Sequence, residues 1–197
     1  MTMTEDLPLL IVGLGNPGRD YKENRHNVGF MLIDRLSVRW DARNMKIQSK
    51  AIVISTRWEG RKLLLAKPQT YMNLSGTSVQ GLLKFYKLPL DNLLVAHDDL
   101  DLPFGALRIR PGGGPGGQRG VEDIINRLGT QEYARLRIGI DRPPGRMDPA
   151  NYVLQDFPSK DLIALSQLLD RAADSVQIWI KEGLNSAMNK FNGSIIL

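Results

Sequence analysis

The sequence predicts an α/β protein whose single domain contains a mixed, mostly parallel twisted sheet flanked by helices. Short apolar runs of strand length alternate along the chain with segments of helical periodicity, an order typical of sheets covered by helices. Two later runs alternate apolar residues with arginine, as strands with one buried face do. The length of 197 residues suits one sizeable core, so we expect residues 1–197 to form one domain.

Four apolar runs are expected to form buried strands, because strands covered on both faces read as continuous apolar segments. They are LLIVGL (9–14), AIVIST (51–56), KLLLAK (62–67) and LLVAH (93–97). The two alternating runs, ALRIR (106–110) and RLRIGI (135–140), are each expected to turn an apolar face to the core and a cationic face to solvent.

Helices are predicted where apolar residues recur at a spacing of three to four. The predicted helices cover residues 28–40, 75–87 and 119–128, then a long segment that ends at 183, then a short segment with Leu184, Met188 and Phe191. Gly129 is the expected C-cap of the third helix, and Gly183 ends the long one. Ser159 is the expected N-cap of the long helix.

Composition narrows the classes of protein that fit. The chain has 26 Lys and Arg against 21 Asp and Glu, and its net charge of +5 favours an anionic partner. It has no cysteine, which excludes disulfides, thiol nucleophiles and cysteine-ligated zinc. Its first ten residues are acidic where a secretory signal would be basic, and no apolar run approaches the roughly 20 residues of a membrane span. We therefore expect a cytoplasmic protein that does not enter a membrane.

A glycine triplet follows the first predicted strand: Gly13, Gly15 and Gly18 have the spacing G-x-G-x-x-G. A dinucleotide site would need a helix to open at the third glycine and an acidic residue at the end of the second strand. Instead a polar segment follows Gly18, and Asp34 lies inside a predicted helix. A dinucleotide oxidoreductase is therefore not favoured, and the triplet predicts a tight turn that leads into the sequence RHN.

Polar residues gather where predicted strands end, which is where α/β proteins place their chemistry. His26, one of two histidines in the chain, follows the first strand. It is a candidate general base because an imidazole accepts a proton near neutral pH, or else a surface histidine at a helix start. Asn73 lies between a strand and a helix, where it is either a site residue or a turn residue.

Three carboxylates, Asp98, Asp99 and Asp101, follow the strand at 93–97. Such a cluster could hold a metal ion or consist of solvated loop residues. A third possibility is that one carboxylate orients a histidine, since this fixes the ring tautomer and favours the imidazolium that forms when the base takes a proton.

The sequence RPGGGPGGQRGV (110–121) is a glycine-rich loop that leads into a predicted helix. Such a loop can present backbone N–H groups to an anion, although it lacks the P-loop pattern of nucleoside triphosphatases. Residues 105–146 carry eight arginines against four acidic residues. Their alternation on two strands favours a face that binds a polyanion over a merely solvated basic surface.

Five motifs together resemble the bacterial-type peptidyl-tRNA hydrolase family, and they occur in the family's order. They are VGLGNPG (12–18), RHNVG (25–29), KPQTYMNLSG (67–76), HDDLDLPFG (97–105) and RLRIGI (135–140). The resemblance implies an esterase that cleaves the bond between a peptide and the 3′ ribose of tRNA. It further implies a monomeric α/β domain that needs neither metal nor cofactor.

The resemblance also implies roles for individual residues. His26 would be the base that activates water, and Asp98 the carboxylate that holds it. Asn16 would contact the first amide of the peptide, and so distinguish peptidyl-tRNA from free aminoacyl-tRNA. The residues that would bind the substrate beside the ester are Asn73, Tyr71 and Tyr21. On the alternating strands, Arg108, Arg110 and Arg137 are expected to contact tRNA phosphates.

One motif departs from the family. The chain reads GGQRG where the family usually has GGHNG, so that Gln118 and Arg119 replace histidine and asparagine. Arg119 can donate to a carbonyl, a ribose or a phosphate, but it cannot accept a hydrogen bond. A non-catalytic RNA-binding relative with the same fold is the alternative to an enzyme.

Overall fold

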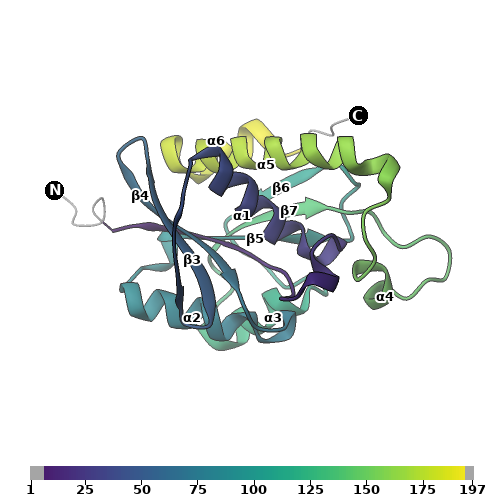
Figure 1. Ribbon diagram of the computed structural model, residues 1–197, viewed down its shortest axis with the longest axis horizontal. Coiled ribbons are helices and arrows are strands. Elements are labelled where there is room, and N and C mark those ends of the chain that lie inside the picture. Colours follow the sequence, from purple (N-terminus) through teal and green to yellow (C-terminus); the bar gives the residue numbers. More distant parts are fainter. Residues whose placement is uncertain (1–6, 194–197) are drawn as a thin grey trace.

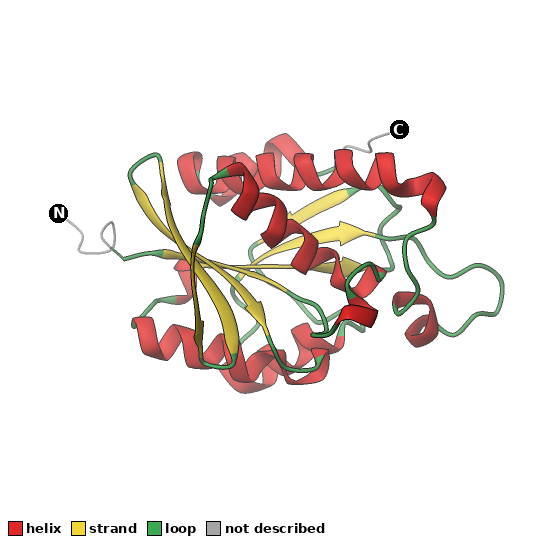
Figure 2. Cartoon of the chain, in the orientation of Figure 1, coloured by secondary structure: helices red, strands yellow, loops and turns green. Residues whose placement is uncertain are grey.

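A computed structural model describes residues 7–193, which form one seven-stranded sheet with helices on both faces (Figures 1 and 2). The strands, in chain order, are β1 (Leu9–Gly13), β2 (Asn44–Gln48), β3 (Ala51–Trp58), β4 (Arg61–Pro68), β5 (Leu93–Asp99), β6 (Leu107–Arg110) and β7 (Ala134–Gly139). Their order across the sheet is β2-β3-β4-β1-β5-β7-β6. The predicted α/β class and all six predicted strands are confirmed.

The centre of the sheet is parallel and its margins are antiparallel. β1 pairs in parallel with β4 and β5, and β5 pairs in parallel with β7. The hairpin of β2 and β3 continues the sheet antiparallel beyond β4, and β6 closes the other edge antiparallel to β7. The carboxyl ends of β1, β4 and β5 therefore meet at one edge, where the loops that follow them lie together.

Helices cover both faces of this sheet (Figure 1). They are α1 (Val28–Arg39), α2 (Ser75–Tyr86), α3 (Arg119–Leu128), α4 (Pro149–Val153), α5 (Leu162–Glu182) and α6 (Leu184–Phe191). α1, α5 and α6 lie on one face, whereas α2 and α3 lie on the other (Figures 1 and 2). Gly129 and Gly183, with φ of 70° and 87°, end α3 and α5 as predicted.

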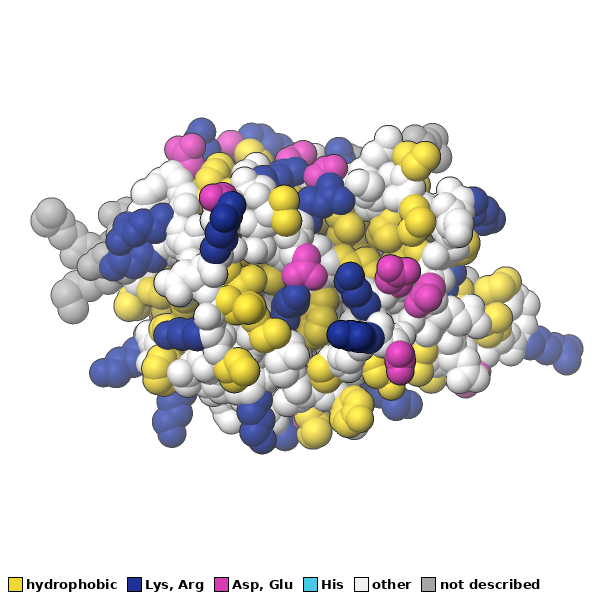
Figure 3. All heavy atoms as spheres, in the orientation of Figure 1, with side chains coloured by type: hydrophobic (Ala, Val, Ile, Leu, Met, Phe, Trp, Pro, Cys, Tyr) yellow, Lys and Arg dark blue, Asp and Glu magenta, His cyan; other side chains and the backbone are white. Residues whose placement is uncertain are grey.

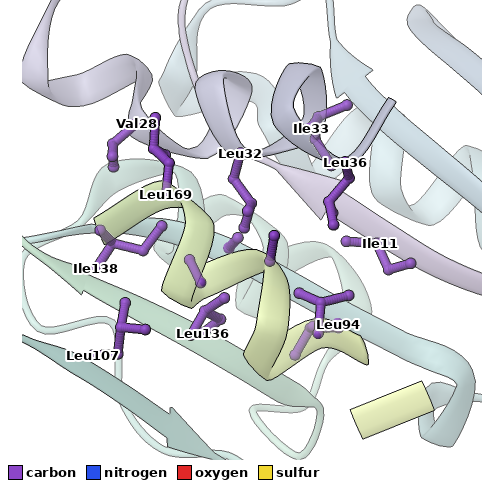
Figure 4. Close-up of a cluster of buried hydrophobic side chains, with 14 of the residues drawn as sticks. Ile11, Val28, Leu32, Ile33, Leu36, Leu94, Leu107, Leu136, Ile138 and Leu169 are labelled. Carbon is purple, nitrogen blue, oxygen red and sulfur yellow. The ribbon is translucent and has the colours of Figure 1, made fainter. Parts of the chain in front are cut away.

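Two buried clusters occupy the two sides of the sheet. Leu9 and Ile11 of β1 belong to the cluster between the sheet and helices α1 and α5. Leu10 and Val12 belong to the cluster between the sheet and helices α2 and α3. Figure 4 shows the first cluster, in which leucines of α1 and α5 point toward the strands. Because alternate residues enter opposite clusters, both faces of β1 must be apolar, which explains its continuous apolar run.

Two glycines of the triplet, Gly13 and Gly15, let α1 pack against β1 and the turn after it. A Cβ at Gly13 would lie 2.1 Å from the carbonyl oxygen of Gly29, and one at Gly15 would lie 2.7 Å from the Phe30 ring. Gly18 precedes a 3-10 turn, Arg19–Tyr21, and not an α-helix. Gly13 and Gly15 therefore allow the close approach of a helix, and no α-helix begins at Gly18, consistent with the rejection of a dinucleotide loop.

Three local details differ from expectation. The prediction that Ser159 caps the long helix is wrong, because Ser159–Asp161 form a 3-10 turn and α5 begins after Asp161. Neither α4 nor β2 was predicted. β2 is a largely exposed edge strand, and it joins β3 through Ser49 and Lys50, which both adopt positive φ. A two-residue turn of this kind normally contains glycine or asparagine, so the sequence carried no hairpin signal.

Candidate active site

Six of the predicted site residues line one cavity of about 490 Å³ at the carboxyl edge of the sheet. They are Asn16, His26, Tyr71, Asn73, Asp98 and Arg119. These residues come from the loops after β1 and β4, from β5 itself and from the start of α3. Tyr21 is half-buried against Gly18 and does not line the cavity. Residues of α4, including Val153, complete the wall.

His26 and Asp98 form a buried pair at the base of this cavity. His26 lies in a 3-10 turn, Arg25–Asn27, that leads into α1, and Asp98 lies near the end of β5. The Nδ1 of His26 is 2.8 Å from Oδ2 of Asp98, and the two residues are 9% and 3% exposed. A carboxylate accepts and does not donate, so Nδ1 carries the proton and Nε2 of the neutral ring is left as an acceptor.

The environment of Asp98 keeps it ionised. Burial by itself would raise the pKa of this carboxyl, but the attraction of His26 and the hydrogen bonds from His26 and Gln118 outweigh it. The pKa of Asp98 is therefore below its ordinary value of 3.8. A permanently charged partner fixes the His26 tautomer and stabilises the ring when it gains a proton.

Asn16 is oriented by its neighbours on both sides. Its backbone N–H donates to Oδ1 of Asn27 over 2.9 Å, and Nδ2 of Asn27 donates back to the Asn16 carbonyl over 2.9 Å. Its side-chain Oδ1 accepts from the N–H of Met72 over 2.7 Å. The acceptor of Asn16 is thus engaged, which leaves Nδ2 as its donor for a ligand in the cavity. Asn27, the third residue of RHN, was not predicted to have this role.

The glycine-rich loop delivers Gln118, and not Arg119, to the buried pair. The Nε2 of Gln118 donates to Oδ1 of Asp98 over 3.0 Å, while its Oε1 accepts from the N–H of Val121 over 2.8 Å and so caps α3. Arg119 is exposed at the cavity wall, and within residues 7–193 no hydrogen bond or ion pair of its side chain is recorded. The two residues that depart from the family pattern therefore occupy different environments.

The arginines of β6 and β7 share one face of the sheet but not one environment. Arg110 is exposed, and Arg108 and Arg137 are half-buried. The guanidinium of Arg137 pairs with Asp99, which also lines the cavity. Arg135 contradicts the expected cationic face, since it is only 3% exposed and donates to the carbonyls of Gly113 and Gly114. The glycine-rich loop covers this arginine, and the strand pattern could not reveal that cover.

The charges on the side of the molecule shown in Figure 3 form no single patch. There, lysine and arginine side chains are scattered among acidic and apolar ones (Figure 3).

The three clustered aspartates take separate partners: Asp98 binds His26, Asp99 binds Arg137 and Asp101 binds Arg142. Among residues 7–193 no group of three or more His, Asp or Glu side chains is placed to hold a metal ion. None of the described helices has the length and apolarity needed to cross a bilayer.

Comparison with known proteins decides the family of this site. The family model described as peptidyl-tRNA hydrolase matches residues 10–196. The chain belongs to the peptidyl-tRNA hydrolase family. It is 48% identical over 192 residues to the peptidyl-tRNA hydrolase of Frankia casuarinae, covering 98% of each chain. It is 48% identical over 184 residues to that of Brevibacillus brevis, covering 93% of this chain and 97% of the relative.

Solved structures of peptidyl-tRNA hydrolases have the same fold. The enzyme from Acinetobacter baumannii superimposes with a TM-score of 0.89 at 34% identity, over 99% of each chain. The resemblance found in the five motifs is thus confirmed, and the chain is a hydrolase. A non-catalytic RNA-binding relative is not favoured.

Proposed function

We propose that this peptidyl-tRNA hydrolase cleaves the ester between a peptide and the 3′ ribose of tRNA with His26 as general base. The observation that carries the proposal is the buried pair of His26 and Asp98, which leaves Nε2 of His26 as the acceptor for the cavity. Nε2 takes a proton from water as the water oxygen adds to the ester carbonyl carbon. The carbon–oxygen bond to the ribose then breaks, and His26 returns the proton to the leaving 3′ oxygen.

Asn16 is proposed to select substrates whose amino group is blocked. Its free Nδ2 donates to the acyl carbonyl that an N-blocked aminoacyl ester has and a free aminoacyl ester lacks. A free aminoacyl ester instead presents a cationic amino group, which Arg119 repels. Tyr71 and Asn73 are exposed at the cavity wall, where they are proposed to bind the substrate beside the ester. For Tyr21 the geometry adds no support.

The tRNA is proposed to lie along β6 and β7. Arg110 is exposed on this face, and Arg108 is directly opposite Arg137 in the antiparallel pair. Because Asp99 both pairs with Arg137 and lines the cavity, the arginine face begins at the edge of the site. Cations in this position fix the tRNA backbone without reading its sequence.

We further propose that the chain acts as one functional domain and as a cytoplasmic monomer, without metal or cofactor. In the proposed reaction, water supplies the nucleophile, and the charges are managed by His26 and Asp98. No step requires an oxidant, a reductant or a Lewis acid.

The test is hydrolysis of N-acetyl-aminoacyl-tRNA by the purified chain, compared with the same tRNA carrying the unblocked amino acid. We expect the acetylated substrate to yield N-acetyl amino acid and tRNA with a free 3′ hydroxyl, at a much higher kcat/KM than the unblocked one. We also expect dialysis against a chelator to leave the rate unchanged. Equal rates on the two substrates would remove the role proposed for Asn16, and no hydrolysis of either would overturn the proposed function.

A further inference from the structure

Gln118 contacts the Asp98 carboxylate at Oδ1, the oxygen that does not bind His26. It is the residue before α3, has an extended backbone with φ −79° and ψ 110°, and is 7% exposed. Its side chain therefore lies back against the end of β5, where it reaches Asp98. The hydrogen bonds of the Asp98 carboxylate that are recorded within residues 7–193 come from His26 to Oδ2 and from Gln118 to Oδ1.

Two of its partners determine the orientation of the Gln118 amide, and its Nε2 also donates to the sulfur of Met72 over 3.2 Å. The N–H of Val121 can only donate, so it must face the amide oxygen. The Asp98 carboxylate can only accept, so it must face the amide nitrogen. A flipped amide would lose both hydrogen bonds and place its oxygen against the carboxylate.

This fixed amide limits rotation of the carboxylate. With both oxygens bound, one to a neutral donor and the other to the imidazole, Asp98 presents Oδ2 to Nδ1 of His26 in one orientation. The other charged group of this strand end is accounted for separately, because Asp99 pairs with Arg137. His97 donates to the backbone oxygen of Asp98 and not to its carboxylate.

We propose that Gln118 is a positioning residue for hydrolysis: its Nε2 holds the Asp98 carboxylate in the orientation that keeps His26 in its basic tautomer. This role rests on the proposed function of His26. It differs from the helix-capping role of the same side chain, because the cap uses Oε1 and the positioning uses Nε2. The side chain thus couples the start of α3 to the catalytic pair.

Two substitutions separate the two roles. Gln118→Ser keeps an oxygen that can accept from the N–H of Val121, but it is too short to reach Asp98. Gln118→Ala removes both contacts. We expect both variants to lose about tenfold to a hundredfold in kcat, the loss expected for one hydrogen bond to a charged group. KM should stay within about twofold, and only Gln118→Ala should show a clearly lowered Tm.

Rescue completes the test. Gln118→His retains a ring N–H that can donate to Asp98, and we expect it to recover kcat to within about fivefold of the unchanged chain. Wild-type kcat in Gln118→Ser would overturn the proposal, as would a loss of kcat that follows Tm across the variants. Failure of the unchanged chain to release peptide would instead overturn the proposed function, and this proposal with it.

Discussion

The two histidines of the chain both bind Asp98 through Nδ1, yet they lie in different environments. His26 donates to the carboxylate over 2.8 Å and lines the cavity. His97 donates to the backbone oxygen of Asp98, also over 2.8 Å, but it is fully enclosed and its Nε2 has no partner within the described chain. Tyr133 and Arg135 lie on the same side of the sheet as His97, where they contact one another. Like His97, each has a buried polar atom without a partner in the described chain.

The two rings differ in access to the cavity, and this difference is what the role proposed for His26 as base rests on. Both rings carry their proton on Nδ1 and leave Nε2 as an acceptor. Only the acceptor of His26 belongs to a cavity that a substrate and a water molecule can enter. Burial lowers the pKa of His97, outweighing the hydrogen bond from its ring to the Asp98 backbone and the attraction of nearby carboxylates. His97 is therefore a neutral structural group.

The largest expected effect comes from exchanging each histidine for asparagine, which can imitate Nδ1 as a donor but cannot accept a proton. We expect His26→Asn to lose about a hundredfold or more in kcat, and to keep tRNA affinity. His97→Asn should stay within about fivefold of the unchanged chain. Single-turnover hydrolysis at saturating enzyme measures both, and equal losses would break the distinction between the two rings.

The second largest effect is expected at Asp98, whose carboxylate binds His26. Asp98→Asn has one oxygen for two donors, His26 and Gln118. Either one hydrogen bond is lost, or the His26 ring accepts from the new amide and carries its proton on Nε2, where it no longer acts as a base. We expect kcat to fall about tenfold to a hundredfold. Asp101→Asn is the matched control, because Asp101 pairs with Arg142 outside the cavity, and it should leave kcat unchanged. If both variants had normal kcat, Asp98 would not assist the base.

The arginines repeat the contrast between an accessible and a buried group, since Arg110 and Arg135 are directly opposite one another on β6 and β7. Arg110→Gln should raise KM severalfold and reduce the salt dependence of KM by about one charge. Arg135→Gln should leave the salt dependence unchanged but destabilise the fold by about 2 kcal/mol, because the carbonyls of Gly113 and Gly114 lose a charged donor. An unchanged salt dependence in Arg110→Gln would place the tRNA elsewhere.

The smallest effect is a pH dependence of stability from His97. Below about pH 6.5, the ordinary pKa of histidine, the unfolded chain protonates this residue while the folded chain keeps it neutral. The unfolded state then binds more protons, so stability falls as pH falls, by at most about 1.4 kcal/mol per pH unit. His97→Asn should lose this part of the slope. Chemical denaturation between about pH 7.5 and 5.5, the range in which histidine titrates, measures how the stability of each chain changes with pH. Identical slopes for the two chains would contradict a lowered pKa of His97.

The sequence predicted the parts of the site that depend on strand ends. Parallel strands bring their carboxyl ends to one edge, so the sequence is enough to place Asn16, His26 and Asp98 near one another. The motif resemblance then assigned their roles. Strand alternation also predicted a cationic face turned to solvent. Arg110 is exposed as expected, whereas Arg135 on the same face is buried.

The parts that could not be predicted depend on how covered each side chain is and on where it points. Arg135 and Arg137 share the same alternation, but the glycine-rich loop covers only the first, and loop paths do not follow from periodicity. Gln118 and Arg119 are neighbours, yet the change from extended to helical backbone between them sends one to Asp98 and the other to the cavity wall. The two hydrogen bonds between Asn27 and Asn16 likewise depend on the geometry of the turn.

The tautomer of the His26 ring tests most directly whether this residue is the base, because a base needs an unprotonated and accessible Nε2. His97→Asn leaves His26 as the single histidine of the chain, so a long-range proton–nitrogen correlation spectrum of the neutral ring reports on it alone. We expect a proton on Nδ1, toward Asp98, and none on Nε2. A proton on Nε2 would contradict the role of His26 as base, because the nitrogen left for the cavity could not then accept a proton from water.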